Sequence, residues 1–345
     1  MGGEPHQPAG TQKRKSLEMS TSTQNKRIKL TNGHLKSPEF TQHPTFWADD
    51  GSVLIQIGDM RMKLHKSRLM ANSTWFRSLF DGMSPEENIN PDVVQYDDGL
   101  ALLHLDLMDV RREDFEVLVT AMDNSLDFFL APQTFSCIAG LVRASSILRF
   151  PKLLSYASSI LERDFSGRLT PPFSVKEAVE AVELGRRYSY PLILKRGFYE
   201  LARGAEQFNS HLDSGEHQLK TGSSLLERLG ITNLAILLDL RRALVQTWID
   251  ITHLPPIECD QPTGKCTASD PTKTWELMYG SGLLKDYQSD PMLGIYKLWE
   301  VDWEAKGYCN KCRVERMKWL GEQRNKIWVE DMEKWLSLQV AAVKK

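Results

Sequence analysis

Four of the five cysteines have a spacing that could bind a metal ion. Cys309 and Cys312 form a C-x-x-C motif, and Cys259 and Cys266 form a second pair upstream, separated by a turn that contains Pro, Thr and Gly. Four thiolates are a common ligand set of structural zinc sites, and His253 is a further candidate ligand. The alternative is a set of unconnected reduced thiols, because the spacing of the upstream pair is unusual for zinc.

A closed site of this kind would be structural. It would tie the loop over residues 255–272 to the helix that follows the C-x-x-C motif. A redox role for the motif is less favoured, because no thioredoxin-like βαβ pattern surrounds it. Cys137 lies in an apolar helical segment and is predicted to be a core residue. We therefore expect no cofactor other than this candidate zinc ion.

His65 is another residue that could do chemistry, in the stretch DMRMKLHKSRLMANST over residues 59–74. A catalytic histidine needs a nucleophile or carboxylate within hydrogen-bond reach and a group that orients it. Its neighbours Lys66 and Ser67 do not supply this arrangement, since adjacent helical residues point in different directions. We favour a structural histidine whose ring nitrogens satisfy backbone groups where a strand meets a helix.

The sequence contains none of the common enzyme motifs: no P-loop, no G-x-G-x-x-G, no H-E-x-x-H and no G-x-S-x-G. The chain is therefore predicted to be non-catalytic, and an active site without a motif is the alternative. The composition, 41% hydrophobic and 26% charged, is that of an ordinary globular protein. No apolar run approaches the ~20 residues of a membrane helix, so no membrane partner is expected.

Charge is unevenly distributed along the chain. The net charge is -2, but residues 1–40 hold seven Lys and Arg against three Glu, which leaves the remainder acidic. Direct nucleic-acid binding is therefore not expected, because neutralising phosphates requires a basic face.

Residues 1–44 are rich in Gln, Ser, Thr, Pro and Lys and are predicted to be a disordered basic tail. Two basic clusters, separated by ten residues, are typical of a bipartite nuclear import signal. Their members are Lys13, Arg14, Lys15, Lys26, Arg27 and Lys29. The alternative is a solvated basic tail, so the expected location is the nucleus, the cytoplasm or both.

A β-hairpin is predicted next, because residues 52–57 and 61–65 both alternate apolar and polar side chains around a Gly-Asp turn. Residues 81–100 are expected to be a polar loop and 102–107 a third strand. Helices are predicted from Ser73, an N-cap, through Phe80, and then over residues 113–122, 133–149 and 151–163. A small sheet with many helices and no βαβ alternation indicates an α+β fold.

The remainder of the chain is predicted to be mainly helical. Ser174 and Glu177 form a capping box at the start of a helix pair over residues 174–204. Residues 223–251 are expected to form two helices broken at Gly230, with loops over 205–222 and 252–272. Residues 273–340 carry most of the tryptophans, which we assign to core packing, with a partner surface as the alternative.

Residues 50–80, DGSVLIQIGDMRMKLHKSRLMANSTWFRSLF, resemble the opening of a BTB/POZ domain. The resemblance is carried by a hairpin, a histidine that begins a helix, a Leu-Ala-x-x-Ser step and aromatic positions in a second helix. The residues that match these positions are His65, Leu69, Ser73, Phe76 and Phe80. Residues 103–119 resemble the strand–loop–helix that follows, and residues 138–162 the closing helix pair. The remainder resembles the helical, cysteine-bearing extension of fungal BTB-domain proteins.

This resemblance implies a BTB/POZ domain over residues 45–165 and a helical extension over 166–345. Within the extension, helix pairs are expected over 166–251 and a Cys- and Trp-rich helical tail over 252–345. The implied function is protein–protein interaction, with homodimerisation through the BTB domain and recruitment of partner proteins. Leu69, Met70 and His65 are the expected interaction residues. The alternatives are a substrate adaptor on a cullin ubiquitin-ligase scaffold and a nuclear regulator with a zinc-stabilised C-terminal region.

Overall fold

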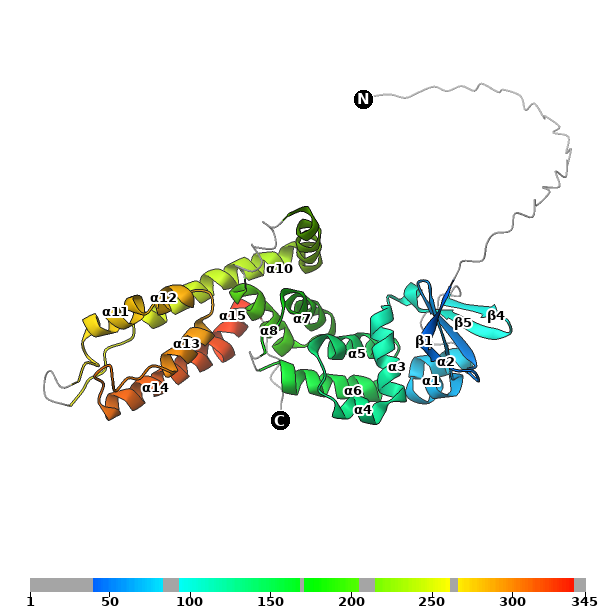
Figure 1. The fold of residues 1–345 in the computed structure, drawn as a ribbon, viewed down its shortest axis with the longest axis horizontal. Helices are drawn as coiled ribbons and strands as arrows, with labels where there is room; N and C mark the ends of the chain where they lie inside the picture. Colours follow the sequence, from blue (N-terminus) through cyan, green and yellow to red (C-terminus); the bar gives the residue numbers. More distant parts are fainter. Residues whose placement is uncertain (1–39, 83–92, 168–170, 205–214, 261–265, 338–345) are drawn as a thin grey trace, which may run out of the picture. The chain divides into compact units, whose positions relative to one another are not determined.

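The computed structural model describes residues 40–82, 93–167, 171–204, 215–260 and 266–337. From Phe40 onward the chain forms one compact unit. A small sheet comes first in the sequence and a long series of helices follows it, as Figure 1 shows. The predicted α+β fold with a mainly helical second part is confirmed. Among the described residues, no helix combines the length and the apolar character needed to cross a membrane.

The sheet has five strands in the order β1-β3-β2-β5-β4. Their bounds are Thr41–Trp47 (β1), Val53–Ile57 (β2), Met60–Leu64 (β3), Val94–Asp97 (β4) and Leu100–His104 (β5). The predicted hairpin is confirmed, since β2 and β3 pair antiparallel with Val53 opposite Leu64. Gly58 in its turn has a φ of 61°, a value that glycine adopts without strain. β2 also pairs with β5 in parallel, which places β2 in the interior of the sheet.

The structure places the start of a strand inside the tail that was predicted to be disordered. Residues 1–44 were expected to be disordered, yet β1 begins at Thr41 and pairs in parallel with β3. Pro44 lies where the register between the two strands shifts, and edge strands tolerate proline because one side of their backbone needs no partner. The two basic clusters of the predicted import signal lie outside the described residues.

The polar loop expected over residues 81–100 contains a strand, β4, that we did not predict. β4 is largely exposed and carries few apolar residues. It is recognised as a strand by its antiparallel pairing with β5. β5 in turn is displaced from the predicted strand over residues 102–107. It ends at His104, and a 3₁₀ turn, Leu105–Met108, follows.

In the described part of the first half of the chain, six α-helices follow or flank the sheet. They are Lys66–Asn72 (α1), Thr74–Phe80 (α2), Arg112–Asp123 (α3), Ser125–Leu130 (α4), Phe135–Ile147 (α5) and Pro151–Ile160 (α6). The predicted N-cap is confirmed, because the Ser73 hydroxyl accepts a hydrogen bond from the Phe76 N–H at 3.0 Å. It also donates to the Leu148 carbonyl at 2.6 Å, which ties α2 to the end of α5.

The second half is helical, as predicted. Its helices are Val175–Tyr188 (α7), Pro191–Arg203 (α8), Gly215–Thr252 (α10), Pro271–Gly280 (α11), Leu283–Asp286 (α12), Pro291–Trp299 (α13), Asn310–Asn325 (α14) and Met332–Trp335 (α15). The capping box of Ser174 and Glu177 is confirmed. The break at Gly230 is also confirmed, since its φ of 74° is not helical. However, α10 starts at Gly215, so residues 215–222 of the expected loop are helical, and residues 205–214 lie outside the described residues.

Two apolar cores share the helix pair α7 and α8. Ala181 and Leu184 of α7 pack into the core of the sheet and α3–α6. Val179 and Val182, on another face of α7, pack into the core of the later helices. Close approach of the pair depends on Gly185, where a Cβ atom would lie 2.6 Å from the Leu194 Cβ. The α7–α8 pair therefore contributes residues to both apolar cores.

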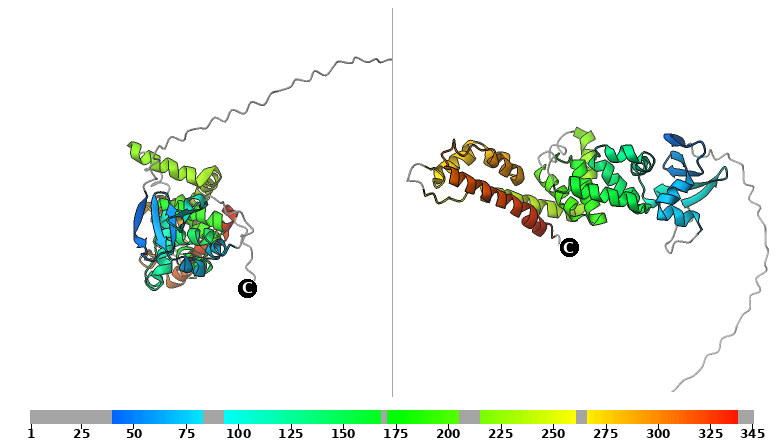
Figure 2. Two further views of the ribbon diagram at one scale, coloured as in Figure 1. Left: turned by 90° about the vertical axis from the view of Figure 1, so that its right-hand side faces the viewer. Right: turned by 90° about the horizontal axis from the view of Figure 1, so that it is seen from below.

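The C-terminal helices return to this pair. In Figures 1 and 2, α15 lies beside α8. Lys195 of α8 donates a hydrogen bond to the Trp328 carbonyl at 2.9 Å and pairs with Glu333 at 3.3 Å. Most tail tryptophans pack in or against the second core, as we predicted. Trp275 is an exception, because its side chain is 54% exposed and stacks on Tyr279.

Candidate metal centre and interaction surface

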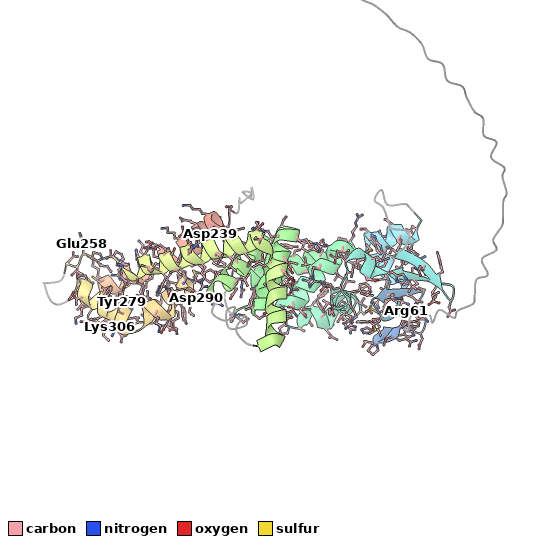
Figure 3. The ribbon with its side chains drawn as sticks, turned by 90° about the horizontal axis from the view of Figure 1, so that it is seen from above. Arg61, Asp239, Glu258, Tyr279, Asp290 and Lys306 are labelled. Atoms are coloured by element: carbon pink, nitrogen blue, oxygen red, sulfur yellow. The ribbon has the colours of Figure 1, made fainter. Side chains whose placement is uncertain are left out.

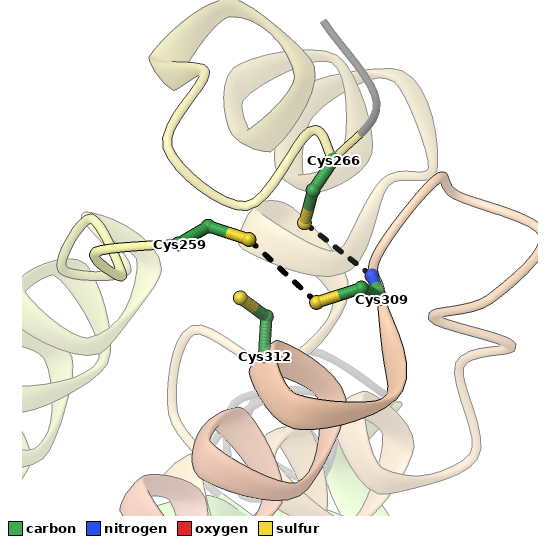
Figure 4. Close-up of side chains that lie close together, drawn as sticks. All are labelled: Cys259, Cys266, Cys309 and Cys312. Atoms are coloured by element: carbon green, nitrogen blue, oxygen red, sulfur yellow. Dashed lines mark hydrogen bonds between the residues drawn. The ribbon is translucent and has the colours of Figure 1, made fainter. Parts of the chain in front are cut away.

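The four cysteines named from the sequence lie together in the structure. The sulfur atoms of Cys259, Cys266, Cys309 and Cys312 are all within 4.8 Å of one another. Figure 4 shows their side chains pointing toward a common centre, two from the segments between α10 and α11 and two from the start of α14. The Cys259 and Cys309 sulfurs are 3.7 Å apart. Residues 50 positions apart in the sequence therefore form one group.

The start of α14 and a tight loop contact position these sulfurs. Cys309 is the N-cap of α14, and its N–H donates a hydrogen bond to the Cys266 sulfur at 3.3 Å. The positive end of a helix stabilises thiolates placed there. Thr267, next to Cys266, donates from its N–H to the Gly307 carbonyl at 3.0 Å. Figure 3 shows Glu258 and Lys306, one from each of the two cysteine-bearing segments, at the same end of the helical region.

Two of these thiols, Cys266 and Cys312, differ in how readily they ionise. For Cys266, burial raises the pKa, but hydrogen bonds from the N–H groups of Cys309 and Ala268 outweigh burial and lower the pKa to about 7. For Cys312, which is fully buried, burial raises the pKa. A nearby cation favours the ionised form of a thiol, so a bound metal would ionise the buried sulfur as well.

The arrangement fits a tetrahedral tetrathiolate site. Zinc–sulfur bonds are about 2.3 Å long, which puts the sulfurs of such a site about 3.8 Å apart. The Cys259–Cys309 distance of 3.7 Å already has this value, and the widest separation exceeds it by only about 1 Å. The group contains no carboxylate or imidazole, and soft sulfur ligands select zinc over magnesium or calcium.

His253, the further candidate ligand, and Cys137, the predicted core cysteine, both lie outside this group. His253 is exposed, and its ring Nδ1 is 2.7 Å from the Ile249 carbonyl, one turn earlier in α10. The structure therefore gives no support to His253 as an additional ligand. Cys137 of α5 is half-buried and donates to the Gln133 side chain at 3.1 Å. Burial raises the pKa of its thiol, as expected for a residue packed against the first core.

His65 does not have the side-chain role that we predicted. It precedes α1, but its ring makes no capping hydrogen bond. The Ser52 hydroxyl instead accepts from the first helical N–H, that of Lys66, at 3.1 Å. The ring lies 3.5 Å from the Asp50 carboxylate, which is 86% exposed. His65 therefore contributes its backbone carbonyl, which accepts from the Leu69 N–H, and a half-buried ring.

The expected interaction residues also change. Leu69 is fully buried, so it offers no atoms to a partner and belongs to the core. Met70 and His65 are half-buried. Sequence reasoning missed a cluster of exposed apolar side chains on α4, which we call the α4 patch. Its members are Leu126 (71% exposed), Phe129 (40%) and Leu130 (76%). The sequence segment SLDFFL could have indicated this patch. It has more apolar residues than one buried face of a six-residue helix can hold, so some of them must be exposed.

The comparisons with known proteins agree with this arrangement. Residues 49–122 match the family model of the BTB/POZ domain. The match runs from just before β2 to the last turn of α3, and so includes the hairpin, α1, α2 and β5. No curated protein matches the chain closely enough to be called a relative. Residues 49–122 of this chain are thus a BTB/POZ domain, a non-catalytic protein–protein interaction module.

Proposed function

We propose that the whole chain is a non-catalytic interaction protein. Its BTB domain, over residues 45–165, self-associates, and the helical extension, over residues 166–345, recruits other proteins. The match to the BTB/POZ family carries this proposal, because domains of this family mediate protein–protein contacts and often dimerise. The α4 patch supports it, since large apolar side chains grouped on a surface are typical of an interface.

Self-association is tested by sedimentation of the full-length chain over a range of concentrations. We expect a dimer that Leu126→Asp combined with Leu130→Asp converts to a monomer. Leu238→Asp is the matched control, because Leu238 of α10 is similarly exposed, at 58%, but lies in the extension. A wild-type chain that stays monomeric at tens of micromolar would contradict self-association. A dimer unaffected by the α4 variant would place the interface elsewhere.

A more specific role is that of a substrate adaptor on a cullin scaffold. The BTB domain supports this role. BTB domains bind other proteins, and binding a cullin scaffold would be one specific form of such binding. Co-purification of tagged full-length protein with a cullin tests it. Retention of the cullin by wild type and its loss from the α4 variant supports the role, and no cullin in either sample contradicts it.

The second candidate function is a nuclear regulator whose C-terminal region is stabilised by zinc. The tetrathiolate group supports the zinc part. Metal analysis of the purified full-length chain should find one zinc per chain, lost in Cys312→Ser and retained in Cys137→Ser, which changes a cysteine outside the group. The nuclear part rests on the two basic clusters in the sequence. A fluorescent fusion should lose nuclear accumulation when Lys13, Arg14 and Lys15 become alanine.

A further inference from the structure

A buried guanidinium lies next to the cysteine group and lacks a counter-ion in the described part of the chain. Arg316 of α14 is fully buried. Its Nη2 donates a hydrogen bond to the Pro255 carbonyl at 2.8 Å, whereas its Nε and Nη1 have no hydrogen-bond partner among the described residues. None of the ion pairs between described residues includes it. Burying a charge in this state is unfavourable unless an opposite charge compensates it.

The position of Arg316 indicates that the cysteines, as thiolates, supply this opposite charge. It follows Cys312 by four residues, so the two side chains lie on the same face of α14. Pro255, its hydrogen-bond acceptor, begins the segment that leads to Cys259. Its guanidinium also lies 5.9 Å from the ring centroid of Tyr308, the residue before Cys309. Arg316 therefore contacts both segments that supply sulfurs.

The charge of a metal-bound site matches this requirement. Metal ligation requires each cysteine as a thiolate, so four thiolates and one Zn²⁺ carry a net charge of -2. The nearby cations at the surface already have partners. Lys311 pairs with Asp260, and Arg313 pairs with Glu304 at 3.2 Å. Arg316 is the buried cation beside this centre.

We propose that Arg316 is a positioning residue of the metal centre, whose guanidinium balances the charge of a zinc tetrathiolate. This inference rests on the zinc site proposed above and assigns a role to a residue that binds no metal itself. The consequence is a coupling between metal and arginine. With zinc bound, the negative charge of the centre compensates the buried guanidinium. Without zinc, the partners of the guanidinium among the described residues are the Pro255 carbonyl and the rings of Tyr308 and Trp319, none of which carries a full negative charge.

The test is Arg316→Met in the full-length chain, measured with zinc and after removal of zinc by a chelator. Zinc affinity, measured by competition with a chromophoric chelator, should fall about 10–100-fold, the usual effect of removing a group that supports metal ligands. The urea midpoint should fall for the zinc-loaded variant and stay unchanged or rise for the metal-free variant. Arg313→Met, which removes a surface cation beside Cys312, is the matched control and should change neither quantity.

A purely structural role predicts something different. If Arg316 only packs and holds Pro255, then Arg316→Met lowers the urea midpoint equally with and without zinc, which would overturn the proposal. Arg316→Lys keeps the charge and covers the case in which the Met variant does not fold. It should bind zinc within a few-fold of wild type, and a loss as large as about 10-fold would also overturn the proposal. If the wild-type chain binds no zinc, the metal site itself is wrong. Metal analysis of the wild type shows this before any variant is made, so the two failures are distinguishable.

Discussion

Replacing Arg143 with methionine should destabilise the whole unit that begins at Phe40. Arg143 of α5 donates to both carboxylate oxygens of Asp114 in α3, at 2.7 and 2.6 Å, and to Glu180 of α7 at 2.6 Å. The side chains of Asp114 and Glu180 are only 7% and 8% exposed. Loss of the guanidinium therefore leaves two buried carboxylates without their cation.

The size of the effect follows from this geometry. Removing one partner of a buried ion pair costs about 3–5 kcal/mol, because the remaining charge stays buried. Glu180 keeps a hydrogen bond from the Ser136 hydroxyl at 3.1 Å, so Asp114 accounts for most of the loss. We expect Arg143→Met to lower the free energy of unfolding by about 3–5 kcal/mol at neutral pH.

Urea unfolding, followed by far-UV circular dichroism and by tryptophan fluorescence, measures this change. Both signals should shift together, because α7 joins the two cores. Arg163→Met is the control, since its ion pair with Asp164 is exposed and should contribute little. Replacing Arg143, Asp114 and Glu180 together by Met, Asn and Gln should recover part of the stability. If Arg143→Met shifts the transition no more than Arg163→Met, the buried cluster does not stabilise the fold.

Three further substitutions test individual contacts by thermal unfolding. Gly294→Ala should lower stability by about 1–3 kcal/mol, because its Cβ atom would lie 2.4 Å from the Trp248 ring, whereas the control Gly280→Ala, with open space at its Cβ, should not. Ser73→Ala should cost about 1–2 kcal/mol through loss of a helix cap and of a buried hydrogen bond, and no change would refute the capping role. His65→Ala should leave stability nearly unchanged, because the ring caps no helix and its ion-pair partner, Asp50, is an exposed carboxylate. A large loss of stability would restore the role first predicted for His65.

The strands show what the sequence could and could not predict. The hairpin of β2 and β3 was predictable because its apolar residues alternate and one face is buried. β1 was not predicted, because it is an edge strand of mostly polar residues that pairs with β3, beyond β2 in the sequence. β4 was not predicted either, because its residues are polar and mostly exposed. Its hairpin with β5 did have a local signal, the two-residue turn Asp98-Gly99, whose φ values are both positive.

The cysteine group shows the same limit. The C-x-x-C half was recognisable from spacing alone, but its convergence with Cys259 and Cys266 depends on the path of α10 through α13. Arg316 could not be singled out, because in the sequence it is one of several charged residues in a helix. Arg316 is distinguished by its burial, by the lack of an ionic partner among the described residues, and by its hydrogen bond to Pro255.

The return of the C-terminal helices to α8 also constrains synthesis on the ribosome. Lys195 is 2% exposed, and its acceptors at Trp328 and Glu333 are 133 and 138 residues later in the chain. At about 5–20 residues per second, translation of that interval takes about 7–28 s. The first core is complete in sequence by Ile193 and can form during this time. The second core cannot form in this interval, because its C-terminal residues have not yet been synthesised. The apolar residues that α7 and α8 contribute to it are therefore accessible to chaperones until α15 emerges.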